Sequence, residues 1–437
     1  MWGKNRYGMV ALSALAVLAM VLPAVSVASG EEGYADGGEG FVVTSAGLLL
    51  APGESPLAVG AVLLMLGGSG ELIWSKDIEW SGGGYSGFRW NDVHLVRSAA
   101  AVADGFIAVG ELVEKYDTAG NPVWQKSFDE AGATLFFSVT GTADGFIAAG
   151  NRDGDGIIMK CDGEGTVIWE ASLAAPGKRF IFQSVTVAPD GLVATGYSHD
   201  ATFFDDNWSA GPRNTVIAKF NDNGTLLWSD ERSMPYDATF CSVAAVPGGA
   251  VAVGGSIGNP LIVRYSNSGA VLWEKDVVGM SSVESVIAVP GGFAVVGEAY
   301  HGPTWDRDAV IAMFSDAGDI VWRKDFGGAD DDSFRSVAAV EGGLIAVGYS
   351  YKGSFGNGDL AGIESKSTRD TIIVMFDDTG GAAWVQNTPW GISAIINTEP
   401  DMSGVWLWMG AFSIAFGLAC GAAFLLSARR QGGHGAE

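Results

Sequence analysis

Basic residues are scarce in this chain of 437 residues, and so are cysteine and histidine. Lys and Arg number 25 against 50 Asp and Glu, so the formal net charge is −25. The sequence therefore argues against nucleic acid as a ligand, because it has no basic stripe that could displace counterions from phosphates. Only 17% of the residues are charged and 48% are apolar, which argues against wholesale disorder and predicts a large core.

Motifs for covalent or metal chemistry are also missing. The sequence contains no nucleophile elbow, zinc motif or phosphate-binding loop. Cys161 and Cys241 fall in different repeats, so buried thiols are favoured over a disulfide. A zinc site would need His94, His199 and His301 to converge, and their spacing gives no support for this. We predict no metal and no cofactor, and calcium is kept only as an alternative ligand of acidic loops.

The N-terminal residues have the pattern of a secretory signal. A short basic stretch precedes the apolar run VALSALAVLAMVLPAVSVASG, which closes in small residues. This order predicts a signal peptide over residues 1–29, with cleavage near Ala28 to Gly30.

A second apolar segment, residues 405–427, contains no charged residue and is followed by Arg429 and Arg430. Its length and the basic residues after it predict a transmembrane helix and a single-pass type I protein in the cell membrane. The other predicted parts are linkers at 30–39 and 399–404, an ectodomain at 40–398 outside the cytoplasm, and a cytoplasmic tail at 428–437.

The ectodomain repeats one phrase seven times: an apolar run, a polar turn ending in glycine, and a tryptophan four residues later. This phrase predicts a β-hairpin whose glycine has a positive φ. The tryptophans are Trp74, Trp124, Trp169, Trp228, Trp273, Trp322 and Trp384.

A second phrase precedes the hairpin six times, as in RSAAAVADGFIAVG. It starts at a serine and ends at a glycine with constant spacing, and it predicts another hairpin about a DG or GG turn. The serines are Ser98, Ser138, Ser184, Ser242, Ser285 and Ser336. Four short antiparallel strands repeated in this way are typical of a β-propeller blade.

The seventh copy of the second phrase is split between the chain ends. GFVVTS (40–45) matches its second strand, and WGISAIINT (390–398) matches its first strand. Joining the two would close the ring and remove the exposed sheet edges. We therefore predict an all-β fold: a seven-bladed β-propeller of four-stranded antiparallel blades, closed by N- and C-terminal strands, plus one C-terminal transmembrane helix.

Loop length varies on only one face of such a propeller. The links between blades and the loops between second and third strands share this face, which we call the loop face. The turns inside the hairpins form the opposite, hairpin face, and they are uniformly short. Variation on one face of a rigid ring predicts a binding surface there.

The loops of the loop face combine carboxylates with aromatic residues, which suits sugars, cations or a protein partner. An acidic, solvated rim with packed aromatics is the alternative interpretation. The candidate binding residues are Trp90, Asp92, Asp205, Asp206, Trp208, Trp305, Asp306, Asp330, Asp331 and Asp332. Asn207 and Asn223 begin glycosylation sequons.

The phrase [FY]-x-[SDT]-x-x-G-x-x-x-W resembles the tryptophan-docking repeat of the quinoprotein-like (PQQ-like, WD40-like) β-propellers, many of which are secreted or surface-anchored bacterial and archaeal proteins. The resemblance covers residues 40–398. It implies that the seven repeated tryptophans pack between neighbouring blades. It does not extend to a quinone cofactor, since the sequence has no vicinal cysteine pair and no matching cofactor residues.

Three functions remain open. The first is a non-catalytic, membrane-anchored cell-surface propeller that binds an extracellular protein, glycan or cation through its loop face. The second is an extracellular enzyme, of glycosidase or lyase type, that uses loop carboxylates at the propeller axis. The third is an assembly scaffold of the cell envelope. The sequence names no catalytic residue, and an enzyme is the less favoured interpretation.

Overall fold

The computed structural model describes residues 42–43, 48–52, 61–66, 72–78, 97–117, 119–200, 213–234, 237–256, 258–277, 279–301, 306–340 and 342–389. For the first four ranges it describes the backbone alone. All of them belong to one compact unit, Met1–Ile392.

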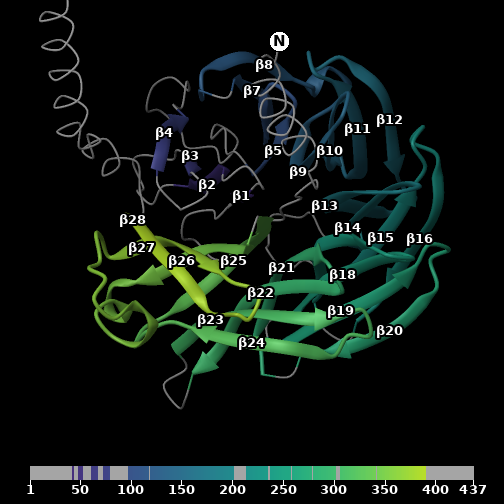
Figure 1. Cartoon of the computed structure of the whole chain (residues 1–437). Helices are drawn as coiled ribbons and strands as arrows, with labels where there is room; N and C mark the ends of the chain where they lie inside the picture. Colours follow the sequence, from purple (N-terminus) through teal and green to yellow (C-terminus); the bar gives the residue numbers. More distant parts are fainter. Residues whose placement is uncertain are drawn as a thin grey trace, which may run out of the picture. The chain divides into compact units, whose positions relative to one another are not determined.

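Six four-stranded antiparallel sheets follow one another from Ser98 to Pro389 (Figure 1). The strands of the first three are β5 (Ser98–Val102), β6 (Gly105–Val109), β7 (Leu112–Asp117), β8 (Pro122–Ser127), β9 (Thr134–Thr142), β10 (Gly145–Arg152), β11 (Asp155–Asp162), β12 (Val167–Leu173), β13 (Lys178–Ala188), β14 (Gly191–Asp200), β15 (Asn214–Phe220) and β16 (Leu226–Arg232). The strands of the other three are β17 (Thr239–Val246), β18 (Gly249–Ser256), β19 (Asn259–Ser266), β20 (Val271–Asp276), β21 (Ser282–Val289), β22 (Gly292–His301), β23 (Asp306–Ser315), β24 (Ile320–Phe326), β25 (Asp332–Val340), β26 (Gly343–Tyr351), β27 (Arg369–Phe376) and β28 (Ala382–Pro389).

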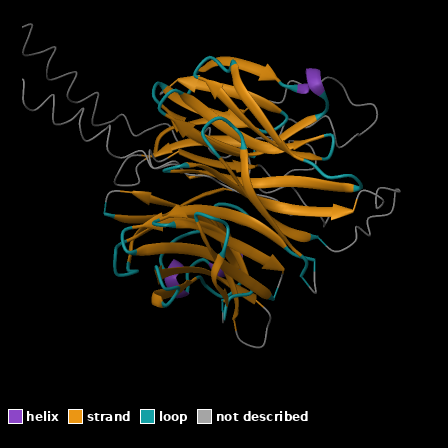
Figure 2. Cartoon of the chain, turned by 90° about the vertical axis from the view of Figure 1, so that its right-hand side faces the viewer, coloured by secondary structure: helices purple, strands orange, loops and turns teal. Residues whose placement is uncertain are grey.

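A further four-stranded sheet precedes these six blades. It consists of β1 (Val42–Val43), β2 (Leu48–Pro52), β3 (Ala61–Leu66) and β4 (Leu72–Ile78). In the described residues the chain is almost entirely strand, with loops only where strands connect (Figure 2).

The first strands of successive blades contact one another, as β9, β13, β17, β21 and β25 do, so they line the central axis. The fourth strands lie outermost and alternate between exposed and half-buried residues. Each sheet therefore runs from a buried inner strand to an exposed outer one.

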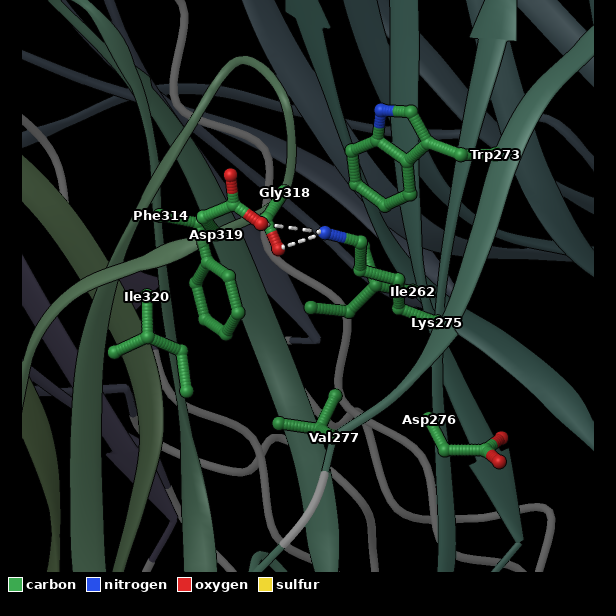
Figure 3. A pocket seen from close by; sticks show the side chains of 9 residues that line it. All are labelled: Ile262, Trp273, Lys275, Asp276, Val277, Phe314, Gly318, Asp319 and Ile320. Carbon is green, nitrogen blue, oxygen red and sulfur yellow. Dashed lines mark hydrogen bonds and ion pairs between the residues drawn. The ribbon is translucent and has the colours of Figure 1, made fainter.

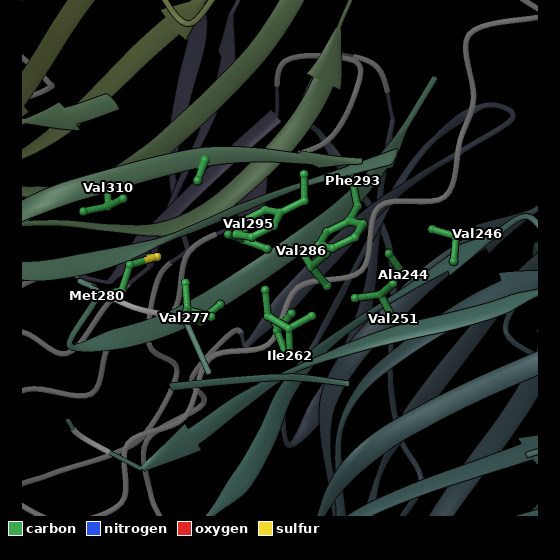
Figure 4. Packing of buried hydrophobic residues seen from close by; sticks show 14 of the residues in the cluster. Ala244, Val246, Val251, Ile262, Val277, Met280, Val286, Phe293, Val295 and Val310 are labelled. Carbon is green, nitrogen blue, oxygen red and sulfur yellow. The ribbon is translucent and has the colours of Figure 1, made fainter. Parts of the chain in front are cut away.

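In the six complete blades both faces of the second strands are buried, which explains their nearly continuous apolar runs. In β18, Ala250 and Ala252 pack on the preceding blade, whereas Val251 and Val253 pack on the following one. Figure 4 shows the second of these cores, between the β17–β20 and β21–β24 blades. Alternate side chains of one strand thus belong to two different cores.

The hairpin between the third and fourth strands has the turn that its glycine predicts. In the β11–β12 hairpin, the Asp162 carboxylate accepts hydrogen bonds from the backbone N–H groups of Glu164 and Thr166 at 3.0 and 2.8 Å. Gly165 follows at a φ of 71°, which favours glycine. The positive φ predicted for these glycines is confirmed throughout the described hairpins.

Five described tryptophans of the outer strands pack on the turn glycine of the next blade. A Cβ on Gly224 would lie 2.6 Å from the Trp169 ring, and one on Gly380 would lie 2.7 Å from the Trp322 ring. The Trp322 indole N–H also donates to the carbonyl of Asp378, at 3.0 Å. Because glycine has no side chain, the tryptophan ring can lie directly on the backbone of the neighbouring turn.

The repeated serines make an equivalent contact near the axis. The backbone N–H of Val185, on β13, donates to Ser138 Oγ of the preceding blade at 3.1 Å. Equivalent bonds run from Val139 to Ser98, from Val243 to Ser184 and from Val286 to Ser242. These serines are fully buried, so each bond satisfies groups that water cannot reach.

The predicted closure by strands from both chain ends is wrong. GFVVTS provides β1, a first strand, and β1 pairs with β2 through Val42↔Leu50 and Val43↔Leu49. All four strands of this sheet come from the N-terminal part of the chain, and β1 contacts β5 and β25 by packing. Pairing of sequence neighbours costs less loop entropy than pairing of the two ends, which explains the difference. Residues 390–398 lie outside the described residues.

Two other parts of the predicted fold class are corrected. Instead of seven equivalent blades, the structure describes six complete blades with shared cores, preceded by a four-stranded sheet whose first strand has 2 residues. The described helices are short 3-10 turns at Asp129–Ala131, Lys352–Ser354 and Gly358–Leu360, and none of them could cross a membrane. The segments predicted as signal peptide and transmembrane helix lie outside the described residues.

Replacement of Gly224 by alanine should lower the free energy of unfolding by about 3 kcal/mol or more, because it adds a clash with Trp169 to an unfavourable φ. Gly248 is the matched control: its φ of 79° is close to the 77° of Gly224, but nothing lies within 4 Å of the added Cβ. Gly248→Ala should cost only about 1–2 kcal/mol. Denaturant unfolding of the full-length variants measures both, and equal costs would contradict the glycine contact.

Ser138→Ala should destabilise the protein by about 1–3 kcal/mol, because it leaves the buried N–H of Val185 without an acceptor. Ser285 is equally buried, but its hydroxyl has no hydrogen-bond partner among the described residues. Ser285→Ala should therefore change stability by less than about 0.5 kcal/mol. Calorimetric melting of the two variants tests the pair, and a larger loss for Ser285→Ala would refute the assignment.

Candidate functional site: the loop face

A folded loop platform covers the loop face of the β25–β28 blade. We define it as the blade link 327–332 together with the loop 352–368. The backbone N–H of Asp359 donates to the carbonyl of Gly327 at 2.9 Å, and its carboxylate pairs with Lys324 at 2.7 Å. A Cβ on Gly328 would lie 2.1 Å from the carbonyl oxygen of Ser354. The loop thus lies directly on the link.

Asp332 is the last residue of the link and is fully buried. Its Oδ2 accepts hydrogen bonds from the backbone N–H of Gly328 at 2.8 Å and from Ser354 Oγ at 2.9 Å. Burial raises the pKa of Asp332 to about 7, and the nearby Asp308 carboxylate adds to the shift. Asp332 therefore joins link and loop, and its burial makes it a structural group.

Arg307 connects the β21–β24 blade to the platform. Its guanidinium pairs with Glu298 at 2.8 Å and with Asp331 at 3.1 Å, and its backbone N–H donates to the Asp331 carboxylate. Burial alone would lower the pKa of Arg307, but the carboxylates of Glu298 and Asp331 outweigh it and raise the pKa. Asp331 is thus an internal ion-pair partner in this structure.

A second charged group lies on the first strands, next to the axis. Arg335 of β25 pairs with Glu284 of β21 at 3.1 Å, and its guanidinium lies 5.4 Å from the centre of the Tyr349 ring. Arg369 lies over the same ring at 4.9 Å and over the Tyr351 ring at 5.4 Å. The group joins two blades through ion pairs and cation–π contacts.

The residues Glu284 and Arg335 occupy β-bulges, each immediately before a repeated serine. A bulge inserts one unpaired residue into a strand and re-aims its side chain. The same position holds Phe137, Gln183 and Cys241 in three other blades. Our sequence reasoning missed these residues. The sequence does contain a signal for them, because the residue before each repeated serine varies from blade to blade while the serine does not.

The structure describes four of the ten candidate binding residues. Asp306, Asp330, Asp331 and Asp332 lie at the ends of β23 and β25, and the last three lie within the loop platform. Asp330 accepts a hydrogen bond from the N–H of Asp331. The other six candidates lie outside the described residues: Trp90, Asp92, Asp205, Asp206, Trp208 and Trp305.

The histidines and cysteines behave as structural residues where they are described. His301 pairs with Asp308 at 2.6 Å, and His199 is buried. The described residues contain no cluster of three or more His, Cys, Asp or Glu that could hold a metal. Neither Cys161 nor Cys241 forms a disulfide. Cys161 is buried, as predicted, and burial raises its pKa to about 12, whereas Cys241 is only partly buried and its thiol donates to the carbonyl of Val283.

A groove lies between the outer strands of two blades. Its volume is about 270 Å³, its floor is formed by Ile262, Val277 and Phe314, and Trp273 forms one wall. Figure 3 shows Lys275 reaching across it to Asp319 and the Gly318 carbonyl. The ion pair closes one side of the groove, which leaves a small apolar recess on the propeller rim.

Exposed aliphatic side chains border this groove and recur around the rim. They occupy the two positions before the repeated tryptophans. The members that are at least two-fifths exposed are Val123, Val167, Ile168, Leu226, Leu227, Val271, Leu272, Ile320 and Val321.

A larger cavity, of about 480 Å³, lies where the first strands of four blades end on the hairpin face. Its lining includes Thr142, Val187, Pro189, Ala245 and Ile287 and contains no titratable side chain. We call it the axial cavity. It differs from the expected catalytic pocket in two ways, since it opens on the opposite face and offers no acid or base.

These observations define a β-propeller protein with a structured, ion-paired loop face. Residues 109–298 and 212–371 match the family of the outer membrane protein assembly factor BamB. The two matches together span more than half of the chain, and the chain belongs to this family. The predicted resemblance to PQQ-like propellers is thereby confirmed. No curated protein sequence matches the chain.

Several solved structures are similar in fold. The Dos1 propeller is 11% identical, with a TM-score of 0.50 over 85% of this chain and 88% of that one. Streptogramin B lyase is 13% identical, with a TM-score of 0.44 over 75% and 95%. The europium-containing methanol dehydrogenase is 11% identical, with a TM-score of 0.45 over 85% and 81%. At these identities the comparisons concern the fold alone.

Stability should fall as the pH rises through the raised pKa of Asp332. Between about pH 4 and pH 7 the folded protein keeps a proton on Asp332 that the unfolded chain releases. The free energy of unfolding should therefore decrease over this range, by up to about 4 kcal/mol. The variant Asp332→Asn should lack this component.

Denaturant unfolding of both proteins at about pH 4, 6 and 8 measures the difference. Because other groups titrate in both proteins alike, the wild-type value minus the variant value isolates Asp332. A difference that is constant across this range would show that Asp332 keeps an ordinary pKa.

Proposed function

We propose that this protein is a non-catalytic binding scaffold outside the cytoplasm, and that its loop platform contacts a protein partner. One observation carries the proposal: the platform is held in one conformation by its own hydrogen bonds and ion pairs, such as Lys324–Asp359 and Arg307–Asp331. A surface that is ordered before binding loses less conformational entropy when a partner binds.

The chemistry of the described residues favours binding over catalysis. The group with the most strongly raised carboxylate pKa, Asp332, is buried within the platform and hydrogen-bonded there. The axial cavity is lined by residues that can neither donate nor accept a proton at neutral pH. An enzyme of the glycosidase type would need two carboxyl groups facing one pocket.

Family membership and the N-terminus support the location and the kind of partner. The family is named for a factor in outer membrane protein assembly, and a protein partner is consistent with that description. The signal-like N-terminal sequence is consistent with a place outside the cytoplasm. A protein partner therefore fits better than a free glycan or cation.

Photo-crosslinking in cells that express the full-length protein tests the proposal. A photoreactive residue at Asn357, an exposed position of the platform, should capture a discrete protein partner. The same residue at Gln125, exposed on the outer strand β8, is the control and should not capture that partner.

A second pair of variants tests whether the conformation of the platform matters. Asp359→Ala removes the carboxylate contacts to Lys324 and to the backbone N–H of Gly327, and it should reduce the Asn357 adduct at least several-fold. Asp325→Ala also removes an ion pair, with Arg323, but leaves the platform intact and should preserve the adduct. Cleavage of a polysaccharide by the purified protein, without any adduct at Asn357, would favour the enzyme instead.

A further inference from the structure

The axial cavity is built into the repeat. The third residue after each repeated serine lies at the end of a first strand, where the blades converge on the hairpin face. In the six blades this residue is Ala101, Gly141, Val187, Ala245, Ala288 or Ala339. Because these side chains are small, they do not fill the space between the ends of the first strands, and the axial cavity remains.

Val187 is the one large residue in this series, and it is 38% exposed. It lines the cavity together with Gly141, Ala245 and Ala288. An exposed aliphatic side chain beside a cavity of about 480 Å³ is an apolar surface that no other described part of the chain covers. The volume lies in the range of small-molecule and side-chain sites, about 300–1,000 Å³.

The rim of this face is acidic. The described hairpin turns contain no Lys, Arg or His. Their carboxylates are Asp104, Asp117, Asp144, Asp162, Asp190, Glu164, Asp222, Asp316, Asp319, Asp377 and Asp378. Asp104, Asp144 and Asp190 are paired with lysines of the third strands, and Asp319 is paired with Lys275 of β20.

Two of the turn carboxylates, Asp162 and Asp377, have a pKa lowered by hydrogen bonds from their own turns. Hydrogen bonds from the Thr166 backbone and from the Thr379 side chain are the main causes that lower the pKa of Asp162 and Asp377, respectively. A face whose described turns carry carboxylates and no basic residue attracts a cationic partner to its apolar cavity and repels an anionic one.

We propose that the hairpin face binds a basic polypeptide segment that inserts one aliphatic or aromatic side chain into the axial cavity. The inserted side chain covers Val187 and the small residues around it, while lysines or arginines on either side of it meet the turn carboxylates. This site is separate from the loop platform, because it lies on the hairpin face and is lined by the blades from β9 to β24. The propeller then holds two different partners at once.

Fluorescence anisotropy with designed peptides tests the recognition chemistry on the full-length protein. The probe is a labelled peptide with a central Leu-Trp flanked by lysines. One comparison peptide has glycines in place of Leu-Trp, and another has glutamates in place of the lysines. The probe should bind at least about tenfold more tightly than either one, and its affinity should fall as salt is added.

Cavity variants separate specific insertion from general attraction. Ala288→Leu fills the cavity and should weaken probe binding at least about tenfold. Ala339→Leu is the matched control, since Ala339 occupies the same repeat position but does not line the cavity. Val187→Lys should also weaken binding, because it places a positive charge beside the cavity. Since Val187 is partly exposed, the lysine can be accommodated without rearrangement of the buried core.

Three results would overturn the proposal. The first is equal binding of the peptide without Leu-Trp, which would reduce the site to a charged surface. The second is unchanged affinity in both Ala288→Leu and Val187→Lys. The third is self-association of the protein in sedimentation that Val187→Lys abolishes, because a second copy would then occupy the cavity. These outcomes are independent of the crosslinks at Asn357.

Discussion

The contact between neighbouring blades is the constraint on which the rest of this structure depends. Each sheet is apolar on both faces, so a blade is stable only when it is packed between two others. Two repeated contacts set the spacing: a serine hydroxyl near the axis, and a tryptophan at the rim that rests on a turn glycine. The hydroxyl is needed at the four serines that accept this bond, and an added Cβ would clash with the tryptophan ring at the five described glycines, which explains why these residues recur from blade to blade.

Because these contacts use only strands and hairpin turns, the ends of the strands on the loop face are free to vary. The bulge before each serine and the loop after each second strand carry the residues that distinguish one blade from another. In the last two blades, these positions hold Arg307, Arg335 and their carboxylate partners. The variable residues thus stabilise a particular loop conformation in addition to forming a surface.

Some of the architecture could be predicted from sequence because it depends on local rules. A glycine in a polar turn before a tryptophan specifies a hairpin, and alternation of apolar residues specifies a strand. The closure was predicted wrongly because GFVVTS matches a second strand in its apolar pattern. Its actual role, as a first strand paired with β2, depends on which segment is nearest along the chain, and pattern matching cannot detect this.

The sequence by itself determined the class of fold, the blade repeat, the free cysteines and the family. It also located the acidic run at Asp330 to Asp332, because composition and spacing are properties of the chain alone. Only the tertiary structure decided that Asp332 is buried under a loop, that Asp331 neutralises an arginine, and that the apolar cavity opens on the hairpin face. The physical reason is that the burial and ion pairing of a residue depend on residues of other blades and loops. These residues are far away in the sequence, so a local sequence pattern does not reveal them.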